Sequence, residues 1–289
     1  MTASNHPRDE SRARLDSTAH PMRSISSHLA GRLGRSALDG SRRPGPPALV
    51  LVAHGSRDPR ALRTAHAIME RVRRLRPAVP VGLGHIELNE PLLPDTLAGL
   101  DGAPAVLVPL LLTRGHHVKR DIPEAVAAAA PHARVAAPLG PHPLLVDTLC
   151  ARLVQAGWRT PTTEAARRGS GIVLAAAGSR DPDSAADTRR TASLLADRLG
   201  VPVVPAYASA AAPTVPAALR ALADRGRRRI AVAACFTAPG RFATQCAEQA
   251  PWIASAPLGA HYALAHLILH RYDQALATPT TTTPELASA

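Results

Sequence analysis

Two histidines and a glutamate stand where they could hold a metal ion or move protons. His54, Glu87 and His117 each lie at or shortly after the end of an apolar run. Imidazole and carboxylate groups bind divalent ions such as cobalt, iron or nickel, and an imidazole also exchanges protons near neutral pH. The residue types therefore predict metal binding, proton transfer or both at one site. Glu90 and His116 stand beside this set and are weaker candidates.

The elements that must position these side chains alternate along the chain. The first half predicts strands over 48–53, 79–87, 104–112 and 133–136 and helices over 60–76, 92–100, 121–130 and 142–156. Strands that alternate with helices of this length form βαβ units, with a parallel sheet covered on both faces. Ligands of such sheets bind beyond the carboxyl ends of the strands. We therefore expect the two imidazoles and the carboxylates to converge on one edge.

The chain is an internal duplication. Four segments of the first half recur in the second half in the same order and at a nearly constant offset, which is not expected by chance. They are 53–59 (AHGSRDP) with 176–182 (AAGSRDP), Pro91 with Pro213, 107–115 with 232–240, and 137–142 (APLGPH) with 256–261 (APLGAH). The predicted fold is α/β, with two duplicated, doubly wound parallel-sheet domains around a central cleft.

The composition suggests where the domains begin and end. Tails of low complexity are expected at both termini, and a Thr- and Arg-rich stretch between the copies is expected to be a loose linker. The predicted parts are a disordered basic tail over 1–47, a first domain over 48–157, a linker over 158–170, a second domain over 171–275 and a disordered tail over 276–289.

The two copies differ in their titratable residues. The second copy has Ala177, Ser209, Ala212 and Phe242 at the positions of His54, Glu87, Glu90 and His117, whereas the GSRDP segment, Pro91 and Gly115 keep their counterparts. The shared segment is then structural, with a glycine turn, an aspartate N-cap and a proline at the first helical position. It lacks the spacing of known phosphate-binding loops. We expect one active site, in the first domain, and a second domain kept as scaffold and lid.

These motifs resemble those of the sirohydrochlorin chelatases of the CbiX/SirB type, which are class II tetrapyrrole chelatases, in their long two-domain form. The resemblance covers about 48–272 and rests on 50–57 (VLVAHGSR), 86–91 (IELNEP) and 108–123, which contains VPLLL and HVKRDIP. It implies a chelatase-like fold and ATP-independent insertion of Co²⁺ or Fe²⁺ into sirohydrochlorin, for cobalamin or sirohaem biosynthesis. Such an enzyme is a lyase that forms nitrogen–metal bonds.

The resemblance also assigns roles. His54, His117 and Glu87 would be both catalytic residues and metal ligands: the histidines would present the ion on one face of the macrocycle, and Glu87 would balance charge or relay protons. No organic cofactor is implied, and the divalent ion (Co²⁺, Fe²⁺ or Ni²⁺) is a substrate. Because sirohydrochlorin is a polycarboxylate, guanidinium and ammonium groups would bind it. The candidates are Arg57, Arg60, Arg114, Lys119 and Arg120.

Composition limits the other function classes. The net charge is +12, but nearly all of it comes from arginine, and aromatic residues make up only 2%, too few for stacking on single-stranded nucleic acid. No apolar run approaches a membrane span. Three cysteines without a CxxC pair fit a reducing compartment. We therefore expect a cytoplasmic protein that binds neither nucleic acid nor membranes.

Two alternatives stay open from the sequence. A non-enzymatic cobalt- or nickel-binding protein would use the same histidines, and a histidine-type phosphatase would also place a His-Gly pair after its first strand. The phosphatase pattern needs an arginine directly before the histidine, where this chain has Ala53. The sequence leaves open the physiological metal, the pathway and which histidine is the base. We expect a monomer or a weak homodimer, because the duplication makes an obligatory dimer unnecessary.

Overall fold

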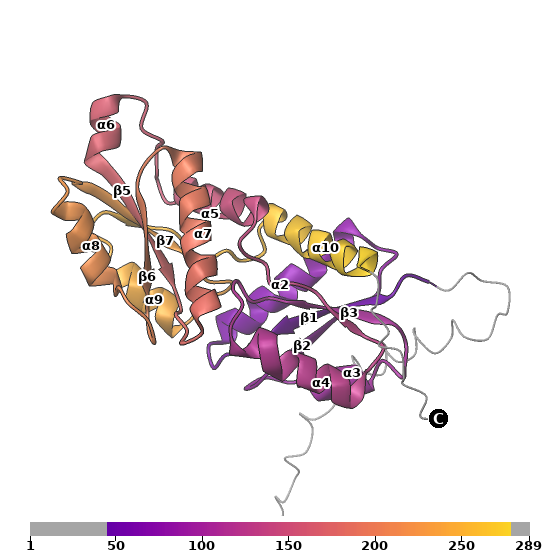
Figure 1. Ribbon diagram of the computed structural model, residues 1–289. Helices are drawn as coiled ribbons and strands as arrows, with labels where there is room; N and C mark the ends of the chain where they lie inside the picture. The colour runs from indigo at the N-terminus through magenta and orange to yellow at the C-terminus, as the bar shows by residue number, and fades with distance from the viewer. Residues whose placement is uncertain (1–44, 279–289) are drawn as a thin grey trace, which may run out of the picture. The chain divides into compact units, whose positions relative to one another are not determined.

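The computed structural model describes residues 45–278, which contain two four-stranded parallel sheets (Figure 1). Of the predicted tails over 1–47 and 276–289, residues 1–44 and 279–289 lie outside the described residues. Each sheet has the same strand order, β2-β1-β3-β4 in the first copy and β6-β5-β7-β8 in the second. The strands are β1 (Ala48–Ala53), β2 (Val81–His85), β3 (Ala105–Pro109), β4 (Arg134–Val135), β5 (Ser170–Ala176), β6 (Val203–Tyr207), β7 (Arg229–Ala234) and β8 (Ile253–Ala254).

Helices connect successive strands, as the periodicity predicts. In the first copy these are α2 (Pro59–Leu75), α3 (Leu93–Ala98), a π-helical turn η1 (His117–Asp121) that continues into α4 (Ile122–Ala129), and α5 (Pro143–Gln155). The second copy has α7 (Pro182–Leu199), α8 (Val215–Ala223), α9 (Arg241–Glu248) and α10 (Tyr262–Ala277). The predicted α/β class with two duplicated parallel sheets is confirmed. No helix within 45–278 is long and apolar enough to cross a membrane.

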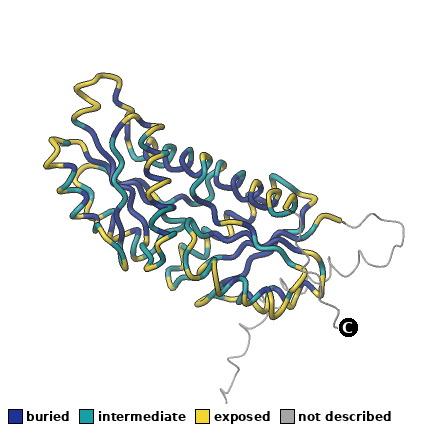
Figure 2. Tube along the Cα trace, in the orientation of Figure 1, coloured by how far each residue is buried: buried dark blue, intermediate teal, exposed yellow. Residues whose placement is uncertain are grey.

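The central strands are apolar throughout because both of their faces are covered. In β1, Leu49 and Leu51 face one layer of helices, whereas Val50 and Val52 pack with residues of α3 and α4. Figure 2 shows the central strands buried in both sheets and the exposed residues on loops and outer helix faces. The face of β1 that carries Leu49 and Leu51 belongs to an apolar cluster that continues through the second copy, so the two sheets share a core.

The last helix of each copy packs on the sheet of the other copy. Helix α10, which ends the second copy, packs against α2, β3 and β4, and α5, which ends the first copy, packs against α7 and β7. The two exchanged helices also contact each other (Figure 1). Sequence periodicity places an apolar face on α5 but does not identify the sheet that covers it, so this exchange was not predicted.

The segment between the copies is more ordered than a loose linker. Trp158 is 1% exposed, and a short helix, α6 (Glu164–Gly169), leads directly into β5. The side chain of Thr163 caps this helix by accepting a hydrogen bond from Ala166 N. A buried tryptophan and a capped helix therefore give local order to the segment that the sequence predicted as a linker over 158–170. The predicted C-terminal tail likewise begins too early, since α10 extends to Ala277.

Candidate active site

The fold brings His54 and His117 together beyond the carboxyl ends of β1 and β3. Their imidazole rings meet edge to face with centroids 4.7 Å apart. His54 follows β1 directly, and His117 begins η1 after the loop that leaves β3. The side chains are partly open to solvent, with 44% and 34% exposed. The two predicted histidines thus form a pair that solutes can reach.

Glu87 lies behind His54. Its Oε1 is 3.4 Å from His54 Nδ1, and the Glu87 main-chain N donates to His54 O at 3.0 Å. Gly55 permits this approach: it has φ +101°, and a Cβ there would lie 1.8 Å from Glu87 O. A carboxylate facing Nδ1 favours the tautomer that leaves the Nε2 lone pair free. His54 Nδ1 also lies 3.3 Å from the carbonyl oxygen of Gly55, so two oxygens face this ring nitrogen.

Asp121 occupies the corresponding place behind His117. One turn separates the two residues, and His117 Nδ1 lies 2.5 Å from Asp121 Oδ2. The intervening turn is π-helical, a geometry that often marks functional sites. Asp121 was not among the predicted site residues. Its spacing of four residues from His117 was the available signal, but the predicted helix began only at Asp121, so the sequence did not place both residues on one helix.

The lower-ranked candidates have local roles. Glu90 Oε2 accepts a hydrogen bond from Leu92 N at 3.2 Å, so its carboxylate braces the turn before α3. His116 is 69% exposed, with Nε2 3.4 Å from the other oxygen of Asp121. Within residues 45–278, no group of three or more His, Cys, Asp or Glu side chains is arranged to hold a metal ion. The geometry thus offers two imidazoles with a carboxylate behind each.

A large cavity opens beside the histidine pair. Its volume is about 1280 Å³, above the usual range for small-molecule sites. Both copies line it: the first with His54, His117 and the α2 segment around Ala65, and the second with residues around Phe236 and Phe242. Cys235 also lines it, but burial raises the pKa of that thiol to about 12, so it stays protonated.

The predicted cationic residues divide into two groups. Arg57 and Arg60 line the cavity, although Arg60 also pairs with Asp58 at 2.7 Å. Hydrogen bonds from Arg60 lower the pKa of that carboxyl group. Arg120 is exposed on η1, outside the cavity lining. Arg241 was missed and lines the cavity from the second copy, at the start of α9.

Arg114 and Lys119, two of the predicted substrate-binding residues, form ion pairs with the second copy. Arg114 pairs with Asp187 of α7 at 2.7 Å, and Lys119 pairs with Asp181 and Asp183 at 2.7 and 2.9 Å. Hydrogen bonds to these two carboxylates raise the pKa of the Lys119 amine. Both cations are thus engaged by the second copy and lie outside the cavity lining. The role of Arg114 and Lys119 in substrate binding stays a prediction, while in the structure both cations pair within the protein.

The second copy reproduces the backbone of the site without its chemistry. Ser209 N donates to Ala177 O at 3.0 Å, as Glu87 N does to His54 O. Gly178 has φ +91°, and a Cβ there would lie 1.9 Å from Ser209 O. The peptide bonds before Pro91 and Pro213 are both cis. In both copies the GSRDP aspartate caps its helix, as predicted. The backbone thus does not require the titratable side chains.

Comparison with known proteins places the chain in a family. The family model described as CbiX matches residues 48–156 and 171–275, most of the chain. The protein therefore belongs to the CbiX family.

Two named relatives illustrate the similarity. The sirohydrochlorin cobaltochelatase of Methanococcus aeolicus is 38% identical over 80 residues, which are 27% of this chain and 56% of that protein. The sirohydrochlorin ferrochelatase of Bacillus subtilis is 32% identical over 176 residues, 57% of this chain and 64% of that protein. Less than two thirds of either relative's length is thus matched.

Solved structures share the fold. SirB from Bacillus subtilis with Fe³⁺ has a TM-score of 0.67 at 23% identity, covering 80% of this chain and 96% of that one. The structure of CbiX described as the terminal enzyme for biosynthesis of siroheme in denitrifying bacteria has a TM-score of 0.60 at 24% identity, covering 80% and 100%. At these identities the likeness establishes the two-sheet architecture.

Proposed function

We propose that this protein inserts a divalent metal ion, Co²⁺ or Fe²⁺, into sirohydrochlorin without ATP. The observation that carries the proposal is the edge-to-face pair of His54 and His117, each with a carboxylate behind it, at a cavity of about 1280 Å³. Membership of the CbiX family and the names of the similar chelatases support the choice of reaction.

The residues present fit the chemistry of metal insertion. One M²⁺ enters the macrocycle, two pyrrole N–H bonds break and two protons leave, so charge is balanced. His54 and His117 present the ion through their Nε2 atoms, while Glu87 and Asp121 face the Nδ1 atoms. An imidazole that has released the ion accepts a pyrrole proton, and the carboxylate behind it stabilises the imidazolium.

Two protein ligands suit an ion that must be passed on. A closed site with four protein ligands would retain its metal, as structural zinc sites do. In this site the nitrogens of the macrocycle would complete the coordination of the metal ion and would then replace the two imidazoles one after the other. We therefore assign Glu87 to orienting His54 and relaying protons, and we treat direct ligation by Glu87 as secondary, since its Oε1 faces Nδ1.

The cavity wall supplies partners for the carboxylates of the substrate. Arg57 and Arg60 come from the first copy and Arg241 from the second. The walls between them are largely apolar, which suits the face of a tetrapyrrole ring. No organic cofactor is needed for this reaction. A monomer or weak homodimer in the cytoplasm remains our expectation.

Anaerobic incubation of the protein with sirohydrochlorin and Co²⁺, Fe²⁺ or Ni²⁺ tests the proposal. The absorbance of the macrocycle should change faster than in the spontaneous reaction, and His54→Ala and His117→Ala should each reduce the rate at least about 100-fold. His132→Ala, at an exposed histidine before β4, is the matched control and should retain full activity.

The other outcomes separate the alternatives. Stoichiometric metal binding without acceleration by any of the three ions would overturn the proposal in favour of a metal-binding protein. Acceleration that survives in both histidine variants would retain the activity but place the site elsewhere. The relative rates of the three ions would identify the preferred metal, which imidazole ligands do not determine.

A further inference from the structure

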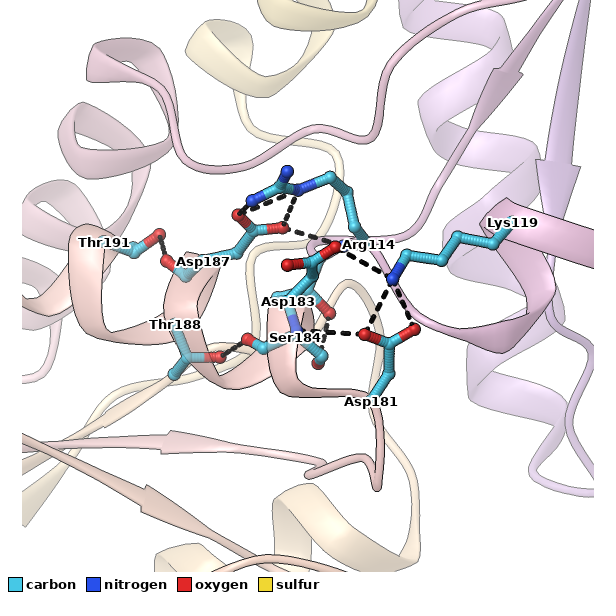
Figure 3. Close-up of polar contacts among 9 residues, drawn as sticks. Arg114, Lys119, Asp181, Asp183, Ser184, Asp187, Thr188 and Thr191 are labelled. Atoms are coloured by element: carbon cyan, nitrogen blue, oxygen red, sulfur yellow. Dashed lines mark hydrogen bonds and ion pairs between the residues drawn. The ribbon is translucent and has the colours of Figure 1, made fainter.

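The second copy contacts the segment that carries His117 through the first two turns of α7. Thr113 Oγ1 lies 2.8 Å from Ser184 Oγ. Lys119 Nζ pairs with the carboxylates of Asp181 and Asp183 (Figure 3). Residues on both sides of His117 are therefore tied to the same helix of the other copy.

Asp187 is the centre of this contact. It is 3% exposed, and its carboxylate accepts hydrogen bonds from Arg114 N at 2.8 Å, Arg114 Nε at 3.0 Å and Arg114 Nη2 at 2.7 Å (Figure 3). It thus holds both the main chain and the side chain of a residue three positions before His117. A main-chain bond fixes the path of the loop more directly than an ion pair between flexible side chains does.

The neighbouring polar groups of α7 are satisfied within the helix. Thr188 Oγ1 donates to Ser184 O at 2.9 Å and Thr191 Oγ1 donates to Asp187 O at 3.0 Å. The carboxylate of Asp187 is therefore directed across to the first copy. Only the Asp187 side of the ion pair is buried, since the Arg114 side chain is 50% exposed, and desolvation of the carboxylate offsets much of the attraction. The Arg114–Asp187 pair therefore suggests a role other than stability, such as holding the loop before His117 in one conformation.

The residues that make this contact differ between the two copies, as the titratable residues of the site do. On α2, the position equivalent to Asp187 is Thr64 and that equivalent to Ser184 is Ala61. On the second copy's loop, Pro239 stands in the place of Arg114 and Thr244 in that of Lys119. The backbone framework is repeated in both copies, but this acidic face occurs only on the helix that meets the histidine-bearing loop.

We infer that Asp187 is a positioning residue: by holding Arg114, it fixes the loop before η1 so that the His117 ring stays against His54. The degenerate copy then completes the active site as well as covering it. This inference rests on the proposed metal insertion. A displacement of about 1 Å at a reacting group is enough to lower a rate about 100-fold.

Steady-state kinetics of Asp187→Asn test the inference. We expect kcat to fall about 10- to 100-fold while KM for sirohydrochlorin changes less than about threefold, because the cavity wall is untouched. Asp273→Asn is the control: Asp273 of α10 makes a similar two-oxygen pair with Arg76, the C-cap of α2, also between the copies but outside the cavity lining. Its kcat should stay unchanged.

Hydrogen exchange supplies a readout that does not depend on turnover. In Asp187→Asn the amides of 113–119 should exchange at least about tenfold faster, whereas those of β1 and β3 should not change. The double variant Arg114→Gln, Asp187→Asn replaces the pair with neutral groups of similar size. It guards against misfolding from an arginine that has lost its partner and should show the same faster exchange.

The outcomes are distinguishable. Wild-type kcat together with unchanged exchange over 113–119 in Asp187→Asn would overturn the inference. An equal loss of kcat in Asp273→Asn would also overturn it, since any pair between the copies would then serve. A wild-type protein that inserts no metal would overturn the proposed function, and the exchange experiment would still decide whether Asp187 holds the loop.

Discussion

Each histidine of the pair is backed by a carboxylate at its Nδ1 atom, and this arrangement determines what the rings can do. Glu87 reaches His54 from the loop after β2, whereas Asp121 reaches His117 from within the same helical turn. In both rings the carboxylate lies at Nδ1, and Nε2 is the atom that the proposed function assigns to the metal ion. The two carboxylates thus take equivalent positions, although different elements supply them.

Asp121→Asn removes the charge behind His117 but keeps the shape of the side chain. We expect kcat to fall about 10- to 100-fold, the usual effect of losing a carboxylate behind a functional imidazole. Steady-state kinetics of Asp121→Asn beside the wild type would measure this change in kcat.

The control for this variant is Glu124→Gln, in the first turn of α4 and without a contact to either histidine. Its kcat should match that of the wild type. A wild-type kcat in Asp121→Asn would contradict the assigned role and leave the short contact with His117 as local helix packing.

Arg241 provides a second prediction at the residue scale, because it lines the cavity from the copy without histidines. Arg241→Glu should raise KM for sirohydrochlorin about tenfold or more, because a carboxylate would then face the carboxylates of the substrate. We expect little change in kcat. Arg225→Glu, on an exposed turn after α8, makes the same change of charge and should leave KM unaltered. Equal KM values for the two variants would exclude Arg241 from substrate binding.

At the scale of elements, the two exchanged helices begin with the same device. The imidazole of His142 caps α5 by accepting from Leu144 N at 3.1 Å, and that of His261 caps α10 by accepting from Ala263 N at 3.2 Å. A ring nitrogen accepts a hydrogen bond only while it is unprotonated. These caps therefore couple the start of each helix to pH.

His142 is the more strongly perturbed of the two. Burial, with smaller contributions from the charges of Arg271 and His270, lowers the pKa of His142 to about 4 from the ordinary 6.5. The unfolded chain thus binds a proton at pH values where the folded chain does not. The stability that this cap contributes is fully present above about pH 6.5. The free energy of unfolding should fall as pH decreases from about 6.5 to about 4, and the loss is complete below that range.

The size of this effect is limited by solvent around the ring. After allowance for screening we expect a loss of about 1–2 kcal/mol. Urea unfolding of the wild type and of His142→Asn at pH 7 and pH 4.5 would measure it. Asparagine is a good N-cap that does not titrate here, so the variant should lose less stability on acidification. The same pH dependence in both proteins would assign it to other groups.

The helices and strands could be predicted from the sequence better than the contacts between the two copies could. Runs of branched residues and the repeated AHGSRDP and APLGPH segments predicted all four strands of the first sheet and the residues at their ends. The pairing of Arg114 with Asp187, 73 positions away, was not predictable. Arginine and aspartate near the ends of predicted helices are also typical of solvated surfaces, and only the packing of the copies distinguishes the two cases.

At the scale of the whole molecule, the exchange of α5 and α10 makes the two copies depend on each other. The fully buried Leu145, Leu149 and Leu153 of α5 belong to the shared apolar cluster, as do Leu264 and Leu267 of α10. Each fully buried leucine contributes about 2 kcal/mol. Removing either copy would therefore expose the face of the remaining sheet that the other copy's helix covers.

This dependence predicts how the first copy behaves alone. A fragment of residues 45–157 keeps α5 but lacks α10, so the face of its sheet beside α2 is uncovered. Helices α5 and α10 follow equivalent strands and begin with nearly the same segment. A second molecule of the fragment can therefore supply its α5 in place of α10. We expect a symmetric homodimer, which light scattering coupled to size exclusion would show at twice the fragment's mass.

Leu149→Asp in the fragment should abolish that dimer together with the helical circular dichroism signal, because it places a charge in the exchanged apolar face. A folded monomer of the unmodified fragment would contradict the dependence between the copies. The dimer would contain two His54–His117 pairs, but the helix facing each histidine-bearing loop would be α2, with Thr64 in the place of Asp187. If α7 fixes that loop in the full chain, the fragment dimer should insert metal more slowly per site than the intact protein.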